Sequence, residues 1–168
     1  MNTILLKGKP VSDALYGQLR PRVDNLVAYG ITPKLVAILV GDDPASQVYI
    51  RNKVRAFNKL SCKSQTYQLS ENTAENEILA LIDKLNNNKD VHGILVQLPL
   101  PCHLESDTIL RTVSPEKDVD GFHPYNLGCL LEGKPKFIPC TPIGILEILK
   151  FYQIQVSGRH VVIVGRSN

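Results

Sequence analysis

Hydrophobic and polar positions follow a helical period over the first part of the chain. Residues 11–29 carry leucine and valine at helical spacing, which predicts an amphipathic helix with Ser12 as its candidate N-cap. Pro21 lies inside this pattern, so we expect a kink or a break into two pieces there. Gly30 is expected to end the helix.

The remainder of the chain alternates between strand-like and helix-like patterns. Short apolar or alternating runs predict strands at 35–40, 63–69, 93–98 and 161–164. Helical spacing predicts helices at 45–60, from a cap at Asn72 or Thr73 to Leu85, at 104–113, and at 142–152 with a proline in its first turn. Apolar strands that alternate with helices indicate an α/β fold, in which helices cover both faces of a parallel sheet in three layers.

The last residues predict the opening of a second domain. The apolar run 161–164 leads directly into Gly165, Arg166 and Ser167, as a strand does where it enters a phosphate-binding turn. We therefore expect one domain over residues 1–155. Residues 156–168 would be the first strand and phosphate loop of an incomplete Rossmann-type dinucleotide-binding domain, which suggests a fragment.

Composition excludes several classes of protein. A chain with 43% hydrophobic and 21% charged residues is neither disordered nor fibrous. The net charge of +3 comes from scattered basic residues, which argues against a nucleic-acid-binding protein. No apolar run approaches the ~18 residues of a membrane helix, and the N-terminus lacks a signal peptide, so we expect a cytoplasmic protein. The four cysteines and four histidines are dispersed, so neither a metal site nor a disulfide framework is expected.

Two candidate functional groups come from the predicted helix 45–60 and the strand 93–98. Tyr49 and Lys53 are four residues apart and share one helical face, where an amine beside a ring could serve a planar ligand. Spacing alone favours an ordinary exposed Tyr–Lys contact, because such pairs are common on helices. Gln97 interrupts an apolar strand at its carboxyl end, where open α/β sheets bind ligands. A structural glutamine that bonds the following loop is the alternative.

A loop with two carboxylates supplies a third candidate. If residues 117–122 are extended, Asp118 and Asp120 point to opposite sides, so only one of them can face a given ligand. A carboxylate there could accept paired hydrogen bonds from adjacent N–H groups, although turn-forming aspartates explain the pattern as well. The further acidic ligands of a calcium loop are absent. His123 is expected to pack within the loop.

Together, these segments resemble a known enzyme family. The segments are Pro44–Tyr49 with Lys53, Gly93–Pro101, Lys117–Pro124, Pro139–Pro142 and Gly165–Asn168. In this order they resemble the bifunctional methylenetetrahydrofolate dehydrogenase/methenyltetrahydrofolate cyclohydrolase family over essentially the whole chain. The resemblance implies NADP as cofactor, a tetrahydrofolate derivative as substrate, a place in one-carbon metabolism and purine biosynthesis, and a homodimer when the protein is full length.

The resemblance also implies roles for individual residues. Lys53 would handle protons, Gln97 would orient it and the water, Tyr49 would stack on the folate, and Asp120 would bind the pterin. The remaining implied residues are Val96, Leu98 and Pro99 in the substrate pocket and Gly165, Arg166 and Ser167 in the NADP site. A truncated, non-catalytic folate-binding module is the alternative, since a chain without a complete dinucleotide domain could not place the nicotinamide.

Overall fold

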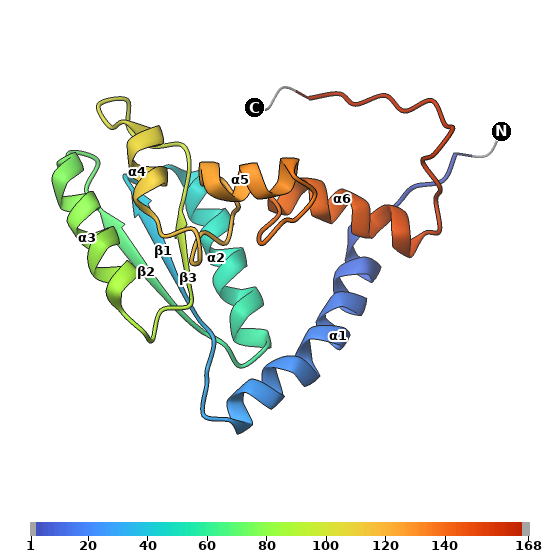
Figure 1. The fold of residues 1–168 in the computed structure, drawn as a ribbon, viewed down its shortest axis with the longest axis horizontal. Helices are drawn as coiled ribbons and strands as arrows, with labels where there is room; N and C mark the ends of the chain where they lie inside the picture. Colours follow the sequence, from blue (N-terminus) through green and yellow to red (C-terminus); the bar gives the residue numbers. More distant parts are fainter. Residues whose placement is uncertain (1–2, 166–168) are drawn as a thin grey trace.

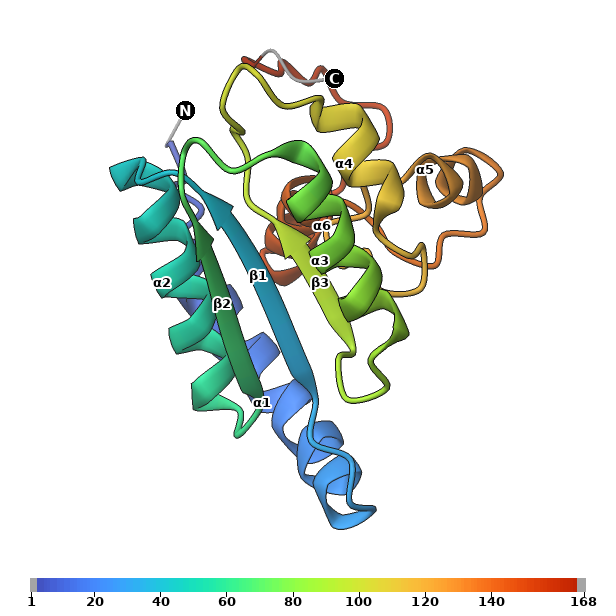
Figure 2. The ribbon, with the colours of Figure 1, turned by 90° about the vertical axis from the view of Figure 1, so that its left-hand side faces the viewer.

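The computed structural model describes residues 3–165, which fold around a parallel three-stranded sheet (Figures 1 and 2). The strand order is β2-β1-β3, with β1 (Lys34–Val40) between β2 (Lys63–Leu69) and β3 (Gly93–Val96). Both pairings are parallel. Residues 35–40 of the central strand are all buried, as a strand with neighbours on both edges and helices on both faces should be.

The described residues contain six helices. They are α1 (Gly8–Ala28), α2 (Pro44–Lys59), α3 (Glu75–Asn87), α4 (Ser106–Thr112), α5 (Pro124–Leu131) and α6 (Cys140–Phe151). Figure 2 shows α2 on one side of the sheet and α3 with α4 on the other. Ile50 of α2 packs on Ala37 and Leu95, whereas α3 and α4 cover the opposite face of the sheet with residues such as Ile78 and Ile109. The predicted three-layer α/β arrangement is therefore confirmed.

The start and course of the first helix differ from the prediction. α1 begins at Gly8 with Lys7 at its N-cap, so Ser12 lies inside the helix and is not its cap. The helix also runs through Pro21 without a break into two pieces. Val11 and Val23 lie on either side of this proline and both are buried, so packing holds the two halves in one helix despite the lost backbone hydrogen bond.

Three further expectations need correction. α3 begins at Glu75, and its N-cap residue is Ala74, whose side chain forms no capping hydrogen bond. Neither Asn72 nor Thr73 is therefore the cap. Glu75 and Glu77 in the first turn supply the negative charge that a helix N-terminus favours. β3 ends at Val96 rather than Leu98. Helix α5 was not predicted; it begins at a proline and has His123 as its N-cap.

The predicted strand at 161–164 is not formed. These residues have no strand structure, and their exposed fractions rise from 58% at Val161 to 97% at Val164. Among residues 3–165 no neighbouring strand pairs with them, and an apolar segment becomes a strand only where another strand accepts its backbone hydrogen bonds.

Gly93→Ala should destabilise the protein by about 1–3 kcal/mol, because an added methyl group overpacks the contact between β3 and the loop that joins α4 to α5. A Cβ at this position would lie 2.5 Å from Cγ1 of Val119. Gly17→Ala is the matched control, since the space around this glycine in the middle of α1 is open. Urea unfolding should show the control to be more stable than the wild type by about 0.5–1 kcal/mol. Equal effects of the two substitutions would contradict the packing argument.

Candidate active site

Two charged side chains from distant parts of the chain face each other on the α2 side of the sheet. Nζ of Lys53 lies 3.9 Å from Oδ2 of Asp120. Lys53 belongs to α2, and Asp120 to the loop between α4 and α5. Their side chains are 37% and 18% exposed, so the pair is partly shielded yet reachable from solvent. Both are predicted site residues, and the fold brings them together from positions 67 residues apart in the sequence.

Packing of their sequence neighbours explains why the two residues meet. Val54 and Val119, each adjacent to a member of the pair, both pack on a cluster that contains Leu95 of β3. α2 is anchored at its start by Asp43, which accepts a hydrogen bond from the backbone N–H of Ser46 at 2.7 Å. The apolar cluster thereby holds the helix and the loop against the same strand, with the charged groups at its edge.

The two aspartates of the loop have different surroundings. Asp118 is 6% exposed, and its Oδ2 accepts hydrogen bonds from the backbone N–H of His123 and from Nδ2 of Asn126, both at 2.8 Å. It therefore ties the loop to the start of α5, while Asp120 faces Lys53. The ring of His123 accepts from the backbone N–H of Tyr125 at 3.0 Å, in agreement with its expected packing role.

Gln97 lies directly after β3, at the carboxyl end of the sheet. Side chains alternate along a strand, so Gln97 projects to the same face as Leu95, which is the α2 side. Its Nε2 donates to the backbone oxygen of Leu98 at 2.7 Å, as the structural interpretation expected. Its Oε1 is buried and has no hydrogen-bond partner among residues 3–165, which leaves one acceptor for a bound donor.

The other residues predicted for substrate binding have varied positions. Tyr49 is 62% exposed and lies one helical turn before Lys53 on the same face of α2. Val96 is 4% exposed and packs in the core on the α3 and α4 side, so only its backbone is available to a ligand near Lys53. Leu98 is half-buried and Pro99 is exposed in the segment that follows Gln97.

Cys140 is a site residue that sequence reasoning missed. Its Sγ, at the start of α6, lies 3.9 Å from Oδ1 of Asp120 and 3.9 Å from the backbone oxygen of Val119. The dispersed cysteines in the sequence argued only against a metal site and a disulfide framework. The signal that could have found it is its place between two prolines at a helix start, a motif quoted above only for the family resemblance.

The surroundings of Asp120 raise the pKa of its carboxyl above the ordinary value for aspartate. Burial raises the pKa of this carboxyl, and the nearby charge of Asp118 raises it further. The Lys53 ammonium and the hydrogen bond from Cys140 oppose this shift. Burial and the negative charge of Asp120 also raise the pKa of the Cys140 thiol. A carboxyl with a raised pKa, an amine and a free amide oxygen form a set that can bind a polar heterocycle and move protons.

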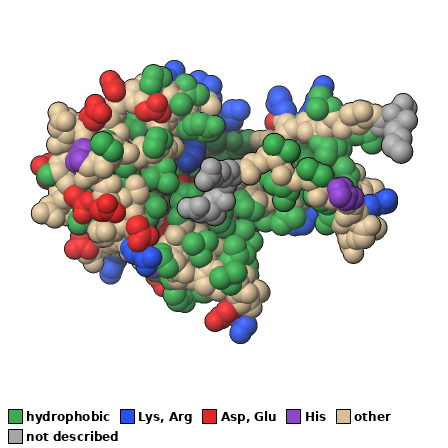
Figure 3. Space-filling view, turned by 90° about the horizontal axis from the view of Figure 1, so that it is seen from above, with side chains coloured by type: hydrophobic (Ala, Val, Ile, Leu, Met, Phe, Trp, Pro, Cys, Tyr) green, Lys and Arg blue, Asp and Glu red, His purple; other side chains and the backbone are tan. Residues whose placement is uncertain are grey.

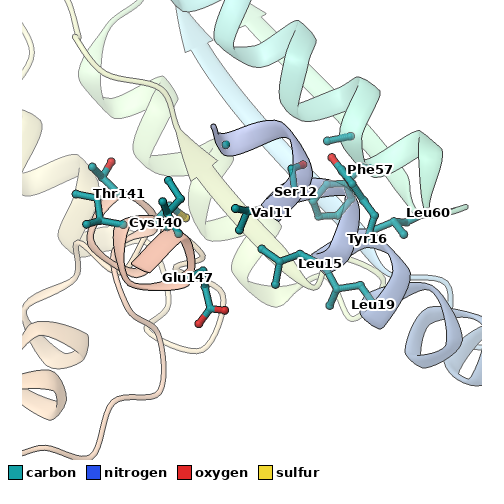
Figure 4. Close-up of a pocket in the computed structure, with 15 residues that line it drawn as sticks. Val11, Ser12, Leu15, Tyr16, Leu19, Phe57, Leu60, Cys140, Thr141 and Glu147 are labelled. Carbon is teal, nitrogen blue, oxygen red and sulfur yellow. The ribbon is translucent and has the colours of Figure 1, made fainter. Parts of the chain in front are cut away.

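A pocket of about 600 Å³ lies beside this set, between α1, the end of α2 and α6 (Figure 4). Its lining is mostly apolar, and Cys140 and Thr141 form one of its ends. None of the four predicted catalytic residues lines it. Seen from above, Figure 3 shows hydrophobic side chains gathered over the middle of the molecule. The charged set thus lies next to an apolar hollow, with Cys140 common to both.

The residues predicted for the cofactor are only partly described. Gly165 has open space around it, which leaves room for a phosphate group to approach its backbone. Arg166 and Ser167 lie outside the described residues. Among residues 3–165, no group of three or more His, Cys, Asp or Glu side chains could hold a metal ion.

Asp120→Asn should stabilise the fold near neutral pH. A carboxyl whose pKa is raised by folding loses stability as the pH rises from its unfolded pKa through its folded pKa, because the charged form is then favoured more in the unfolded chain. The amide carries no such charge. Urea unfolding at about pH 7 should show the variant to be more stable, and at about pH 3.5 the difference should largely vanish. A variant less stable at the higher pH would contradict the burial argument.

Comparison with known proteins finds a matching family model for each of two parts of the chain. Residues 6–120 match the family model described as tetrahydrofolate dehydrogenase/cyclohydrolase, catalytic domain. Residues 139–168 match the model of the corresponding NAD(P)-binding domain. The bifunctional protein FolD of Campylobacter concisus is 49% identical over 98% of this chain, and that of Streptococcus uberis is 48% identical over 99%.

Solved structures show the same similarity in three dimensions. The bifunctional FolD methylenetetrahydrofolate dehydrogenase/cyclohydrolase of Campylobacter jejuni has a TM-score of 0.93 and 47% identity, covering 98% of this chain and 58% of that one. The Trypanosoma brucei enzyme, complexed with NADP cofactor and inhibitor, has a TM-score of 0.89 and 30% identity over 94% of this chain and 55% of its own. The chain spans 58% of the length of the Campylobacter concisus relative and 59% of the Streptococcus uberis one.

Proposed function

Because the chain belongs to the tetrahydrofolate dehydrogenase/cyclohydrolase family, we propose that it acts on one-carbon units carried by tetrahydrofolate. The proposed reactions are the NADP-dependent oxidation of methylenetetrahydrofolate to methenyltetrahydrofolate and the hydrolysis of the latter to formyltetrahydrofolate. The observation that carries the proposal is the Lys53–Asp120 pair, 3.9 Å apart, on the side of the sheet to which Gln97 also projects its free amide oxygen. An amine, a carboxyl and an amide at the carboxyl edge of a parallel sheet suit a ring with adjacent N–H groups.

Binding of the pterin is assigned to Asp120 and Tyr49. A carboxylate can accept two parallel hydrogen bonds from the ring N–H and the amino group of a pterin. Tyr49 is exposed on the same helical face as Lys53, so its ring is free to stack on the planar part of the folate. Gln97 offers its unpartnered Oε1 as an acceptor to the substrate or to the attacking water. Leu98 and Pro99 follow it along the rim, and Val96 contributes only its backbone.

Lys53 is assigned the proton transfers of the hydrolysis. Water adds to the positively charged methenyl carbon, and Lys53 is the group that takes a proton from the adduct. Ring opening then breaks one carbon–nitrogen bond, and the released nitrogen receives a proton while the formyl group stays on the other nitrogen. The half-exposed position of Lys53 allows the surplus proton to pass to solvent.

The oxidation requires alignment more than proton transfer. NADP, when bound, supplies the acceptor for the hydride that leaves the methylene carbon. We assign its phosphate contacts to Gly165, Arg166 and Ser167. The same assignment divides the chain into a folate-binding catalytic domain over residues 1–155 and the first part of an NADP-binding domain over 156–168. The match of the NAD(P)-binding family model to residues 139–168 supports an NADP-binding part at the end of the chain, and this match begins before the proposed boundary at residue 156.

The setting of the reaction completes the proposal. We place it in the cytoplasm, in the one-carbon metabolism that supplies purine biosynthesis, with the full-length protein as a homodimer. These points rest on the family resemblance. Within the described part of the chain, no helix is both long enough and apolar enough to cross a membrane. Sedimentation of the full-length protein tests the dimer.

The experiment that tests the function measures binding and hydrolysis of methenyltetrahydrofolate by the purified chain. We expect saturable binding, and hydrolysis above the rate in buffer alone. Binding without hydrolysis would indicate the folate-binding module instead of an enzyme. Absence of binding by a folded chain would overturn the proposal.

A further inference from the structure

The loop that carries Asp120 lies in backbone contact with the segment that enters α6. Gly121 has a φ of +70°, and a Cβ on it would lie 3.1 Å from the backbone nitrogen of Pro139 and 3.3 Å from the carbonyl carbon of Ile138. Both features disfavour a larger residue at position 121. The left-handed conformation strains one, and the adjacent space is taken by backbone, which moves aside less easily than a side chain. The absence of a side chain at 121 is what permits this approach.

The close approach of these two backbone segments brings together the residues next to Gly121 and Pro139. Asp120 comes immediately before the glycine, and Cys140 comes immediately after Pro139. Their side chains meet, with Sγ of Cys140 at 3.9 Å from Oδ1 of Asp120. The other oxygen, Oδ2, faces Lys53. Each oxygen of the carboxyl therefore has its own neighbour, one from α6 and one from α2.

We propose that Cys140 is a positioning residue for Asp120 and that Gly121 is the position that allows it to act. A thiol donates only a weak hydrogen bond, but it occupies one side of the carboxyl and limits its rotation. The carboxyl then keeps its orientation toward Lys53. The consequence for folate binding rests on the proposed function, whereas the contact between thiol and carboxyl does not.

The groups that act on this carboxyl come from every element packed against it. Lys53 of α2 contributes a positive charge, Asp118 of the same loop a negative one, and Cys140 of α6 a hydrogen bond. Cys140 also lines the neighbouring pocket, where Figure 4 shows it at the end occupied by Thr141. A small reagent can therefore reach the thiol, which makes its state measurable without any folate.

The first test compares Gly121→Ala with Gly133→Ala. Gly133 has a φ of +75° and open space around it, so this control carries the same backbone strain without the collision. The readout is the alkylation rate of Cys140 against pH, followed on its own peptide by mass spectrometry, since Cys102 is also exposed. Gly121→Ala should separate the thiol from Asp120 and lower its pKa, so that alkylation near neutral pH becomes faster by more than about twofold. Gly133→Ala should alkylate like the wild type.

The same rate in both variants and in the wild type, with circular dichroism showing folded protein, would overturn the role of Gly121.

If Gly121→Ala does not fold, a second pair of variants decides the question. Cys140→Ser keeps a donor of similar size, whereas Cys140→Ala removes it. In the alanine variant the hydrogen bond that lowers the pKa of Asp120 is lost, so this pKa should rise. The acid limb of folate binding, which is the loss of affinity as the pH falls, should then occur at a higher pH. The serine variant should keep the limb near its original pH.

Equal pH profiles for Cys140→Ala and the wild type would overturn the positioning role. A wild-type chain that binds no folate would refute the proposed function instead. The alkylation rates of the glycine variants would still test the contact between Cys140 and Asp120.

Discussion

Lys53→Met is expected to abolish hydrolysis of methenyltetrahydrofolate while part of the hydride transfer remains, in the protein with its complete NAD(P)-binding domain. Proton transfer by a positioned group contributes about 10²–10⁴-fold to a rate, so the hydrolysis should fall by that order. The oxidation needs no proton acceptor and depends on alignment, which Tyr49 and Asp120 still provide. Methionine keeps the length of the side chain without the amine. Stopped-flow absorbance of the methenyl compound separates the two steps.

Lys84→Met is the matched control for this substitution. Lys84 is exposed in the last turn of α3, on the opposite side of the sheet from the site. Both activities should stay at the wild-type level in this variant. If Lys53→Met lowers hydrolysis and hydride transfer equally while folding and folate binding remain intact, Lys53 does not have the separate role assigned to it.

Asp120→Ala is expected to weaken folate binding by about 10–150-fold, which corresponds to about 1.5–3 kcal/mol for hydrogen bonds to a charged group. Loss of the carboxylate leaves the ring N–H and the amino group of the pterin without acceptors. Isothermal titration of the folded variant with a stable tetrahydrofolate analogue measures the change. Normal affinity in this variant would remove Asp120 from the site.

The pH dependence of binding gives an independent check on the same residue. Burial raises the pKa of Asp120, so the carboxylate that accepts the pterin hydrogen bonds is lost at a higher pH than for an ordinary aspartate. Wild-type affinity should therefore weaken as the pH falls through this raised pKa. In Asp120→Ala that part of the pH dependence should disappear. An acid limb of the same size in the variant would show that another group titrates.

Local pattern was sufficient for much of the fold. The apolar runs at 35–40 and 93–98 predicted buried strands, because few other environments accept so many adjacent apolar side chains, although the second strand ends at Val96. Helical spacing likewise placed Tyr49 and Lys53 on one face of α2. The pattern failed where packing overrides local preference, as at Pro21 inside α1, and where a strand lacks a partner, as at 161–164.

The sequence by itself determined the kinds of chemical group present and the elements that carry them: an amine and a ring on one helix, an amide after a strand, and two carboxylates in a loop. Only the tertiary structure decided which of them meet. In the fold, Asp118 is buried and hydrogen-bonded to the start of α5, whereas Asp120 faces Lys53. Cys140 lies against the carboxyl of Asp120. The physical reason is that such contacts join residues far apart in the chain. Their geometry depends on the apolar cluster around Leu95 and on the close backbone approach at Gly121, which bring separate segments together. A local sequence pattern contains no information about such packing.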